Sequence, residues 1–399
     1  MISHTCARSI SSHMQIFCYA ACAIAHLVAL VRWRQRSREV NDSRWRQFGR
    51  FLALSSLVGI FGVMVYVARI GNLEFMYRTR LLERLSSPSI EELQLRASFR
   101  SRWHISLALF LGLKPFELCF ATLAYMLVLY RMLQLAVVSS THERPWTLSA
   151  RVVLAVMVAA NVIGICGNVA AAVFFFQAAE ISSKEAQAWA MNDTATALTF
   201  NLTLSQKRTL GTSTAAVQRF CQVFVMLVTV TAFSVVVWNF RRFTLSSLRA
   251  LFMFDQKLQQ RTMTNTPTQG LNNDQSKLVA DAISKAKQLQ YKVTLTFGFT
   301  FIAALLRSFY DVLYALAQSL NDNQNPCSLS PCDACHNVFS NLHGWLVFTP
   351  EFETCVMIIA SPAALLIALW GMSDVHEIEQ MSSPAAKLRY RMRQLRTQL

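Results

Sequence analysis

Five ionisable side chains interrupt the apolar runs of this chain. Lys114 and Glu117 are three residues apart, so they can meet on one face of a helix. Arg307 and Asp311 are four residues apart and can do the same, and Glu351 begins a third run. Counted at about 1.5 Å per residue from the outer ends of their helices, all five reach overlapping depths. Because ionisable groups are expensive inside a bilayer, we expect these residues to line an outer-half polar cavity that binds a small ligand.

The same residues also have a purely structural interpretation, in which ion pairs pin neighbouring helices together. A lone charge at the centre of a bilayer helix costs about 3 kcal/mol on insertion scales, so Arg307 needs counter-charges. As a hypothesis, Arg307 is the central cation, and its partners are Asp311, Glu117 and Glu351. A third interpretation is a transporter, with Lys114, Glu117, Arg307 and Asp311 acting as a relay.

Seven apolar runs supply the elements that would position these side chains. A helix needs about 20 apolar residues to cross roughly 30 Å of hydrocarbon. The composition agrees with a membrane protein, since 53% of the residues are hydrophobic and only 15% are charged. The sequence predicts an all-α, polytopic membrane protein with a single seven-helix domain. The expected spans lie near 14–31, 48–69, 104–130, 151–178, 217–240, 292–318 and 345–372.

The distribution of Lys and Arg predicts the orientation of the chain. The net charge of +16 would suggest nucleic acid in a soluble protein, but here the charge lies between apolar runs. We therefore expect membrane lipid and no nucleic acid as a partner. The expected cytoplasmic segments hold 24 Lys and Arg residues against 12 in the outer segments, which favours an N-terminus outside and a cytoplasmic C-terminus. Segment 69–103 conflicts with this, since it carries seven of the outer basic residues.

The first apolar run, 14–31, leaves two interpretations open. Its length and small residues are compatible with a cleaved signal peptide. However, its positive charge follows the run instead of preceding it, in the seven arginines of segment 32–50. That order favours an uncleaved first transmembrane helix.

Two Asn-x-Thr triplets support the same orientation. Asn192 and Asn201 each begin such a triplet in the expected outer loop 179–219, so both are candidate glycosylation sites. A third triplet of this kind, with serine in place of threonine, begins at Asn41 on the expected cytoplasmic side. The motif alone is therefore a weak indication.

Three cysteines lie close together in the expected outer loop 319–344. In an oxidising compartment, Cys332 and Cys335, or Cys327 and one of them, are expected to form a local disulfide. Zinc binding remains an alternative, and a third thiol could pair with Cys6 or stay free. The eight His residues are scattered, and no nucleophile motif occurs. We therefore expect no enzyme activity, no catalytic residues, no cofactor and no resident metal.

The expected cytoplasmic side offers a basic surface. Segment 241–292 reads as two helices around a turn-rich linker at 264–273, and the basic tail 373–399 suits a helix at the inner leaflet. Anionic lipid explains such a surface as well as a cytosolic protein partner does. For coupling to such a partner, the candidates are Arg131, Arg241 and Arg242.

The N-outside seven-helix topology resembles that of G-protein-coupled receptors. Span three ends in Leu129-Tyr130-Arg131, which keeps only the arginine of their acidic-Arg-Tyr signature. Span seven has Ser361-Pro362 in place of their Asn-Pro motif.

The chain also resembles the tobamovirus multiplication protein family of seven-helix membrane proteins. Three segments carry the resemblance, namely 237–243 (VWNFRRF), 301–307 (FIAALLR) and 358–367 (IIASPAALLI). The resemblance implies a receptor-like protein of the plasma membrane or of endosomal, lysosomal or vacuolar membranes, which works by binding partners.

Three functions remain open on the sequence. The first is a receptor-like protein that binds a small ligand, a cytosolic partner or both. The second is a transporter or channel that uses the intramembrane charges and opens to both faces. The third is a membrane scaffold without a ligand, which would tolerate neutral residues in its spans.

Overall fold

A computed structural model describes residues 2–37, 43–83, 88–137, 144–264, 269–320 and 350–373. The described part of the chain contains helices and no strand, which confirms the all-α fold class. The helices are α1 (Ile2–Ser37), α2 (Ser43–Leu82), α3 (Ile90–Val137), α4 (Arg144–Ala190), α5 (Thr194–Thr264), α6 (Gln269–Leu320), α8 (Pro350–Ile358), the π-helical segment η2 (Ile359–Ala363) and α9 (Ala364–Ser373).

Within the described residues, seven helical segments are long and apolar enough to cross a membrane, as predicted. The seventh segment is built from α8, η2 and α9 together. These candidate spans are Ser12–Gln35, Gln47–Leu82, Ile90–Val128, Ala155–Ala190, Thr194–Ala232, Thr294–Leu316 and Phe352–Trp370.

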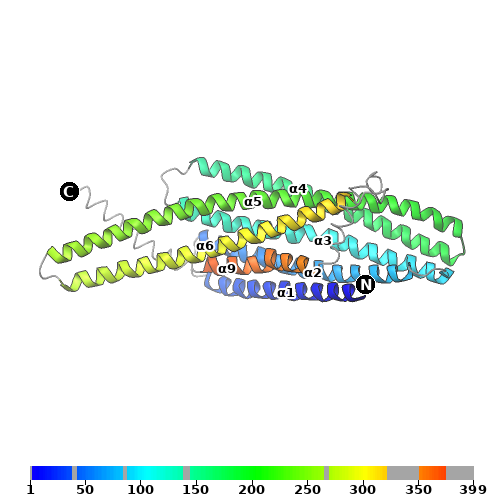
Figure 1. Ribbon diagram of the computed structural model, residues 1–399, viewed down its shortest axis with the longest axis horizontal. Coiled ribbons are helices and arrows are strands. Elements are labelled where there is room, and N and C mark those ends of the chain that lie inside the picture. Colours follow the sequence, from blue (N-terminus) through cyan, green and yellow to red (C-terminus); the bar gives the residue numbers. More distant parts are fainter. Residues whose placement is uncertain are drawn as a thin grey trace.

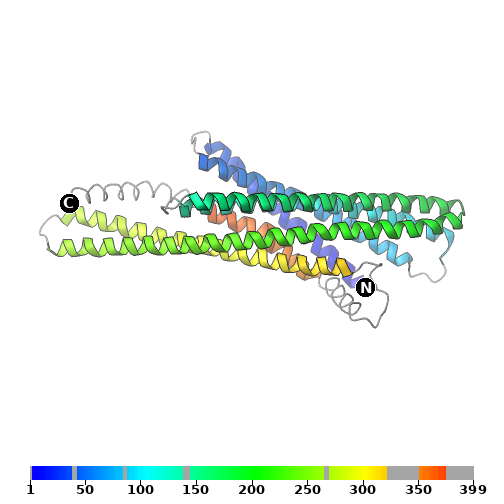
Figure 2. The same ribbon diagram turned by 90° about the horizontal axis from the view of Figure 1, so that it is seen from above.

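The helices form one elongated bundle in which each packs mainly against its neighbours in sequence. The seventh segment lies between α1 and α6, and α3 also contacts α5 (Figures 1 and 2). The segment that carries Glu353 therefore lies within reach of the first and sixth helices.

At each end of the bundle, some helices continue past the point where the others stop, as Figure 1 shows. At one end, α2, α3, α4 and α5 continue past the other helices, and the turn at 191–193 lies there, so we name it the α4–α5 end. At the other, α5 and α6 are the two described helices that continue furthest, toward 264–269, and we name it the α5–α6 end. At 1.5 Å per residue, α5 is roughly 105 Å long, about three times the thickness of the hydrocarbon core.

The two long outer loops expected from the sequence are largely helical. Segment 69–103 reduces to a connection at 83–89, and segment 179–219 reduces to a turn at 191–193. The expected loops began at or next to the first charged residue after an apolar run, Arg69 in one case and Glu180 in the other. A helix does not end there, because its backbone hydrogen bonds are internal whether lipid or water surrounds it.

The turn between α4 and α5 is specified by two residues. Asn192 adopts a left-handed backbone with φ of 58°, a conformation that asparagine tolerates better than most residues. The N–H groups of Asn192 and Asp193 donate to the carbonyls of Trp189 and Ala188, the pattern of a Schellman motif. Asp193 Oδ1 then accepts from the Thr196 N–H at 3.1 Å and caps α5. The hydrogen bonds from Thr196 lower the pKa of the Asp193 carboxyl, so this cap weakens only as the pH falls through that lowered value.

A reciprocal cap starts α3. The Ser89 N–H donates to Glu92 Oε2 at 2.7 Å, and the Glu92 N–H donates to Ser89 Oγ at 3.2 Å. This capping box satisfies two helix-end donors at the α4–α5 end.

Two glycines let α1 and α2 approach closely. A Cβ on Gly59 would lie 2.8 Å from the Ala23 N atom, and a Cβ on Gly62 would overlap the Tyr19 ring. Tyr19 is fully buried where its ring packs against Gly62. The close approach matters because it carries the Tyr19 hydroxyl to the centre of the bundle.

Candidate ligand site in the centre of the bundle

Glu117 on α3 is the anion of the first charged group. Lys114 Nζ donates to Glu117 Oε2 at 2.7 Å, and both side chains are almost completely buried. Tyr19 OH on α1 donates to Glu117 Oε1 at 2.7 Å, and Ser361 Oγ on η2 donates to the same oxygen at 3.2 Å. The i,i+3 spacing read from the sequence therefore produces an ion pair, and two other helices converge on it.

Asp311 on α6 is the anion of the second group. Arg307 Nε donates to Asp311 Oδ2 at 2.9 Å, as the i,i+4 spacing predicted. Arg219 Nη1 on α5 donates to the other carboxylate oxygen at 2.6 Å, and its guanidinium lies 4.5 Å from the centroid of the Tyr314 ring. Arg307 Nη1 also contacts the Met357 sulfur on α8. One buried carboxylate thus joins α5 to α6.

Glu353 on α8 is the anion of the third group. Both of its carboxylate oxygens accept from the Arg69 guanidinium on α2, in a two-pronged ion pair. The Tyr66 ring lies beside this pair and the first group. Its centroid is 5.9 Å from Arg69 Cζ and 5.4 Å from Lys114 Nζ. The pair ties the seventh segment to the second helix.

We call these three groups together the charged cluster. Arg307 is also in Coulombic range of Glu117, so the groups act on one another. The cluster joins α2, α3, α5, α6 and α8, and Tyr19 adds α1. Its seven ionisable members are Arg69, Lys114, Glu117, Arg219, Arg307, Asp311 and Glu353.

Three members of the cluster were not among the residues expected from the sequence. Arg69 and Arg219 lie where expected spans and outer segments meet, so their charge was assigned to the outer side. The sequence singled out Glu351 and not Glu353. No glycine or proline separates these arginines from the adjoining spans, and this could have indicated that the helices continue through them. Tyr19 gave no signal in the sequence, because its role depends on the packing of α1 against α2.

The seventh segment changes its helical geometry beside the cluster. Pro362 lies in η2, where the π-helical turn and the missing proline N–H leave backbone carbonyls without their usual partners. Tyr125 OH on α3 donates to the Ala360 carbonyl at 2.6 Å, and Cys22 Sγ on α1 lies 3.8 Å from the Pro362 carbonyl. Ser361 donates to Glu117 and not to a carbonyl in its own helix.

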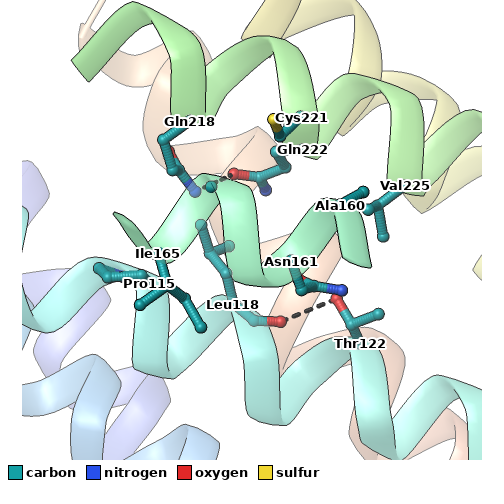
Figure 3. A pocket seen from close by; sticks show the side chains of 11 residues that line it. Pro115, Leu118, Thr122, Ala160, Asn161, Ile165, Gln218, Cys221, Gln222 and Val225 are labelled. Carbon is teal, nitrogen blue, oxygen red and sulfur yellow. Dashed lines mark hydrogen bonds between the residues drawn. The ribbon is translucent and has the colours of Figure 1, made fainter. Parts of the chain in front are cut away.

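A small cavity lies beside the cluster, between α3, α4 and α5 (Figure 3). Its volume is about 10 Å³, which is room for one water molecule. Gln218 Nε2 donates to Gln222 Oε1 at 3.3 Å, and Gln222 Nε2 has no hydrogen-bond partner among the described residues. The polar cavity expected from the sequence was placed among spans three, six and seven, so this cavity lies at a different interface.

A second polar group ties the α4–α5 end together. Arg100 Nη1 on α3 donates to Glu185 Oε2 on α4 and to Asn201 Oδ1 on α5, both at 3.2 Å. Arg100 also lies 3.8 Å from Glu83, which directly follows α2. Asn201 is therefore engaged inside the helical extension, whereas Asn192 is exposed on the turn.

This difference predicts which sequon carries a glycan. Replacing Asn192 by glutamine is expected to remove a glycosidase-sensitive mass shift, because this side chain points from an exposed turn. Replacing Asn201 by glutamine is expected to leave the shift in place, since a glycan there would have to displace Arg100. Electrophoresis before and after glycosidase treatment measures both. Loss of the shift only in the Asn201 variant would contradict the prediction.

Most of the other expected site residues lie partly or wholly outside the described part of the chain. Arg131 is in α3 and Arg241 is in α5, but their side chains lie outside the described residues. Arg242 is exposed on α5, and Glu351 is in α8 with its side chain likewise outside them. The tail from 374 onward and the expected cysteine cluster also lie outside the described residues. The three cysteines concerned are Cys327, Cys332 and Cys335.

No family model, curated protein or solved structure matches this chain. The seven-helix architecture therefore stands on the helices themselves. Neither the tobamovirus multiplication protein family nor the G-protein-coupled receptors gain support as its family.

Proposed function

We propose that this chain is a receptor-like membrane protein that binds a small ligand at the charged cluster and signals through the α5–α6 end. The observation that carries the proposal is the ion pair between Arg219 and Asp311. It joins, inside the bundle, the two helices that continue furthest beyond it.

The length of α5 supplies the coupling. It runs without interruption from Arg219 to Thr264, roughly 65–70 Å at 1.5 Å per residue. A small rotation of α5 against α6 at the cluster would therefore become a larger displacement at the far end. The basic segment 241–292 would present that change to a cytosolic partner or to anionic lipid.

The cost of the cluster supports a role beyond holding helices together. Apolar side chains of similar volume often stabilise a core as well as a buried ion pair does. A cluster of seven ionisable groups is an expensive way to pin helices, and such residues in membrane spans usually mark ligand or ion pathways.

The orientation proposed here has the N-terminus and the α4–α5 end outside, and the α5–α6 end in the cytosol. The charge distribution and the exposed Asn192 sequon support it. The membrane is then the plasma membrane or that of an endosome, lysosome or vacuole.

Hydrogen exchange tests the coupling without a known ligand. Arg219→Lys keeps the charge but loses the guanidinium geometry toward Asp311. We expect the rate of amide exchange in 241–264 and 269–292 to change by at least about twofold. The altered contact with Asp311 should change the free energy of local opening of α5 and α6. Mass spectrometry of the full chain in nanodiscs measures this.

The matched control is Arg208→Lys, the same substitution on the same helix. Arg208 lies 5.1 Å from the centroid of the Trp103 ring, outside the cluster, so its replacement should leave 241–292 unchanged. An unchanged α5–α6 end in the Arg219 variant would reject coupling and favour a scaffold. An equal rise in exchange throughout α4 would indicate general loosening and would also count against coupling.

A transporter is the second candidate, and η2 favours it. The π-helical turn contains Pro362, and its Ser361 donates to Glu117. An interrupted helix at this point could let a substrate reach Glu117 from both faces of the membrane. Uptake of labelled acetate or chloride into proteoliposomes, abolished in Ser361→Leu, would favour transport. The absence of uptake by the wild-type protein would leave the receptor proposal as the better account.

A further inference from the structure

The charged cluster contains more positive than negative charge. Its described side chains comprise four cations and three carboxylates. Arg69 and Glu353 form one balanced pair, and Lys114 and Glu117 form another. Asp311 is the carboxylate in direct contact with both remaining arginines, and Glu117 acts on Arg307 only from a longer distance. The excess of one positive charge therefore lies at this group.

Within the described part of the chain, the excess positive charge has no hydrogen-bonded counter-charge at one edge of the Arg307 guanidinium. The residue is 1% accessible to solvent, and its Nη2 atom is buried without a hydrogen-bond partner among the described residues. Its Nε is engaged by Asp311, and its Nη1 meets the Met357 sulfur, which is only a weak acceptor. One edge of the guanidinium thus lacks a partner that carries charge.

Such an arrangement favours an additional anion. A buried cation left without a counter-charge is strongly destabilising, whereas a paired and hydrogen-bonded one is tolerated. A guanidinium edge suits a carboxylate because its N–H donors are fixed in one plane that matches the two oxygens. A halide can accept from the same donors as a simple counter-charge.

We infer that the cluster binds one monovalent anion, a halide or a small carboxylate, at Arg307 Nη2. A monovalent ion balances the cluster, whereas a divalent ion such as sulfate would reverse the sign of the imbalance. The inference names the ligand class of the proposed receptor site and rests on that function for its biological meaning. Binding itself does not depend on coupling to the α5–α6 end.

Thermal unfolding in controlled anions tests the inference. The full chain in nanodiscs is held in sodium sulfate, and sodium chloride or sodium acetate replaces it at constant ionic strength. A ligand that binds only the folded state raises the Tm in a saturable way, so we expect a rise of a few degrees. The chloride and acetate series distinguish a halide from a carboxylate.

A tethered carboxylate provides the decisive variant. Met357→Glu places an anion beside Arg307 with little change in side-chain length, and it should abolish the response to both anions. Its Tm in sulfate should approach that of the wild type in saturating anion. Met357→Gln is the matched uncharged control and should keep the response.

Three results would overturn the inference. The first is a wild-type Tm that does not distinguish chloride or acetate from sulfate. The second is a Met357→Glu variant that keeps the full anion response. The third is stability that follows pH and not anion concentration, which would mean that Lys114 restores the balance by losing its proton.

Glu351 requires its own control, because its side chain lies outside the described residues. If Glu351 supplied the missing charge, the wild type would ignore anions and Glu351→Gln would respond to them. The wild-type behaviour in that case is the first of the three results that overturn the inference, and the Glu351 variant explains it. A failure here together with altered hydrogen exchange in Arg219→Lys would reject only the ligand class and leave the receptor proposal intact.

Discussion

Replacing Asp311 by leucine is expected to destabilise the protein by about 3–5 kcal/mol, the usual cost of leaving a buried charge without its partner. The carboxylate is fully buried and accepts from both Arg219 and Arg307. Its removal leaves two guanidinium groups without their counter-charge. Reversible unfolding in detergent, followed by intrinsic fluorescence, measures the loss.

Restoring the balance should recover the stability only when both arginines are replaced. Adding Arg307→Leu to Asp311→Leu still leaves Arg219 buried, so the double variant should recover only in part. Adding Arg219→Leu as well should recover most of the loss, since apolar side chains can replace a buried charged group. The control is Glu180→Leu, which removes the anion of an exposed pair with Lys184. If Asp311→Leu cost no more than this control, water would have to reach Asp311, and the buried cluster would be rejected.

The pair between Arg69 and Glu353 is expected to show the second large effect. Each single replacement by methionine should cost about 3 kcal/mol, because the remaining charge is orphaned in a mostly buried site. The double variant should be close to the wild type. A double-mutant cycle in detergent measures the coupling energy, which we expect to exceed about 2 kcal/mol for residues in direct contact.

An exposed pair on the same helix is the matched comparison. Glu74 and Arg78 lie one turn apart on α2, and each side chain is about half exposed. The same cycle there should give less than about 1 kcal/mol, as surface ion pairs do. Equal coupling energies at the two sites would contradict the burial of Arg69 and Glu353 and their role in holding the seventh segment.

The architecture and the ion pairs within single helices could be predicted from the amino-acid sequence. Apolar runs of sufficient length require helices in a bilayer, because no water is present to satisfy an exposed backbone. Helical periodicity then brings Lys114 to Glu117 and Arg307 to Asp311, since residues three or four apart share a face. These contacts depend only on local geometry.

Which helices meet at the cluster became visible only in the packed bundle. The contacts of Arg219 with Asp311 and of Arg69 with Glu353 depend on how each helix is rotated and shifted along its axis. Packing sets that register, as when Gly62 admits the Tyr19 ring. The spacing of residues within one helix does not determine this register between helices. The ends of the spans were misjudged for a related reason, because a charge in the sequence suggests contact with water, whereas a charge with a buried partner can remain inside the bundle.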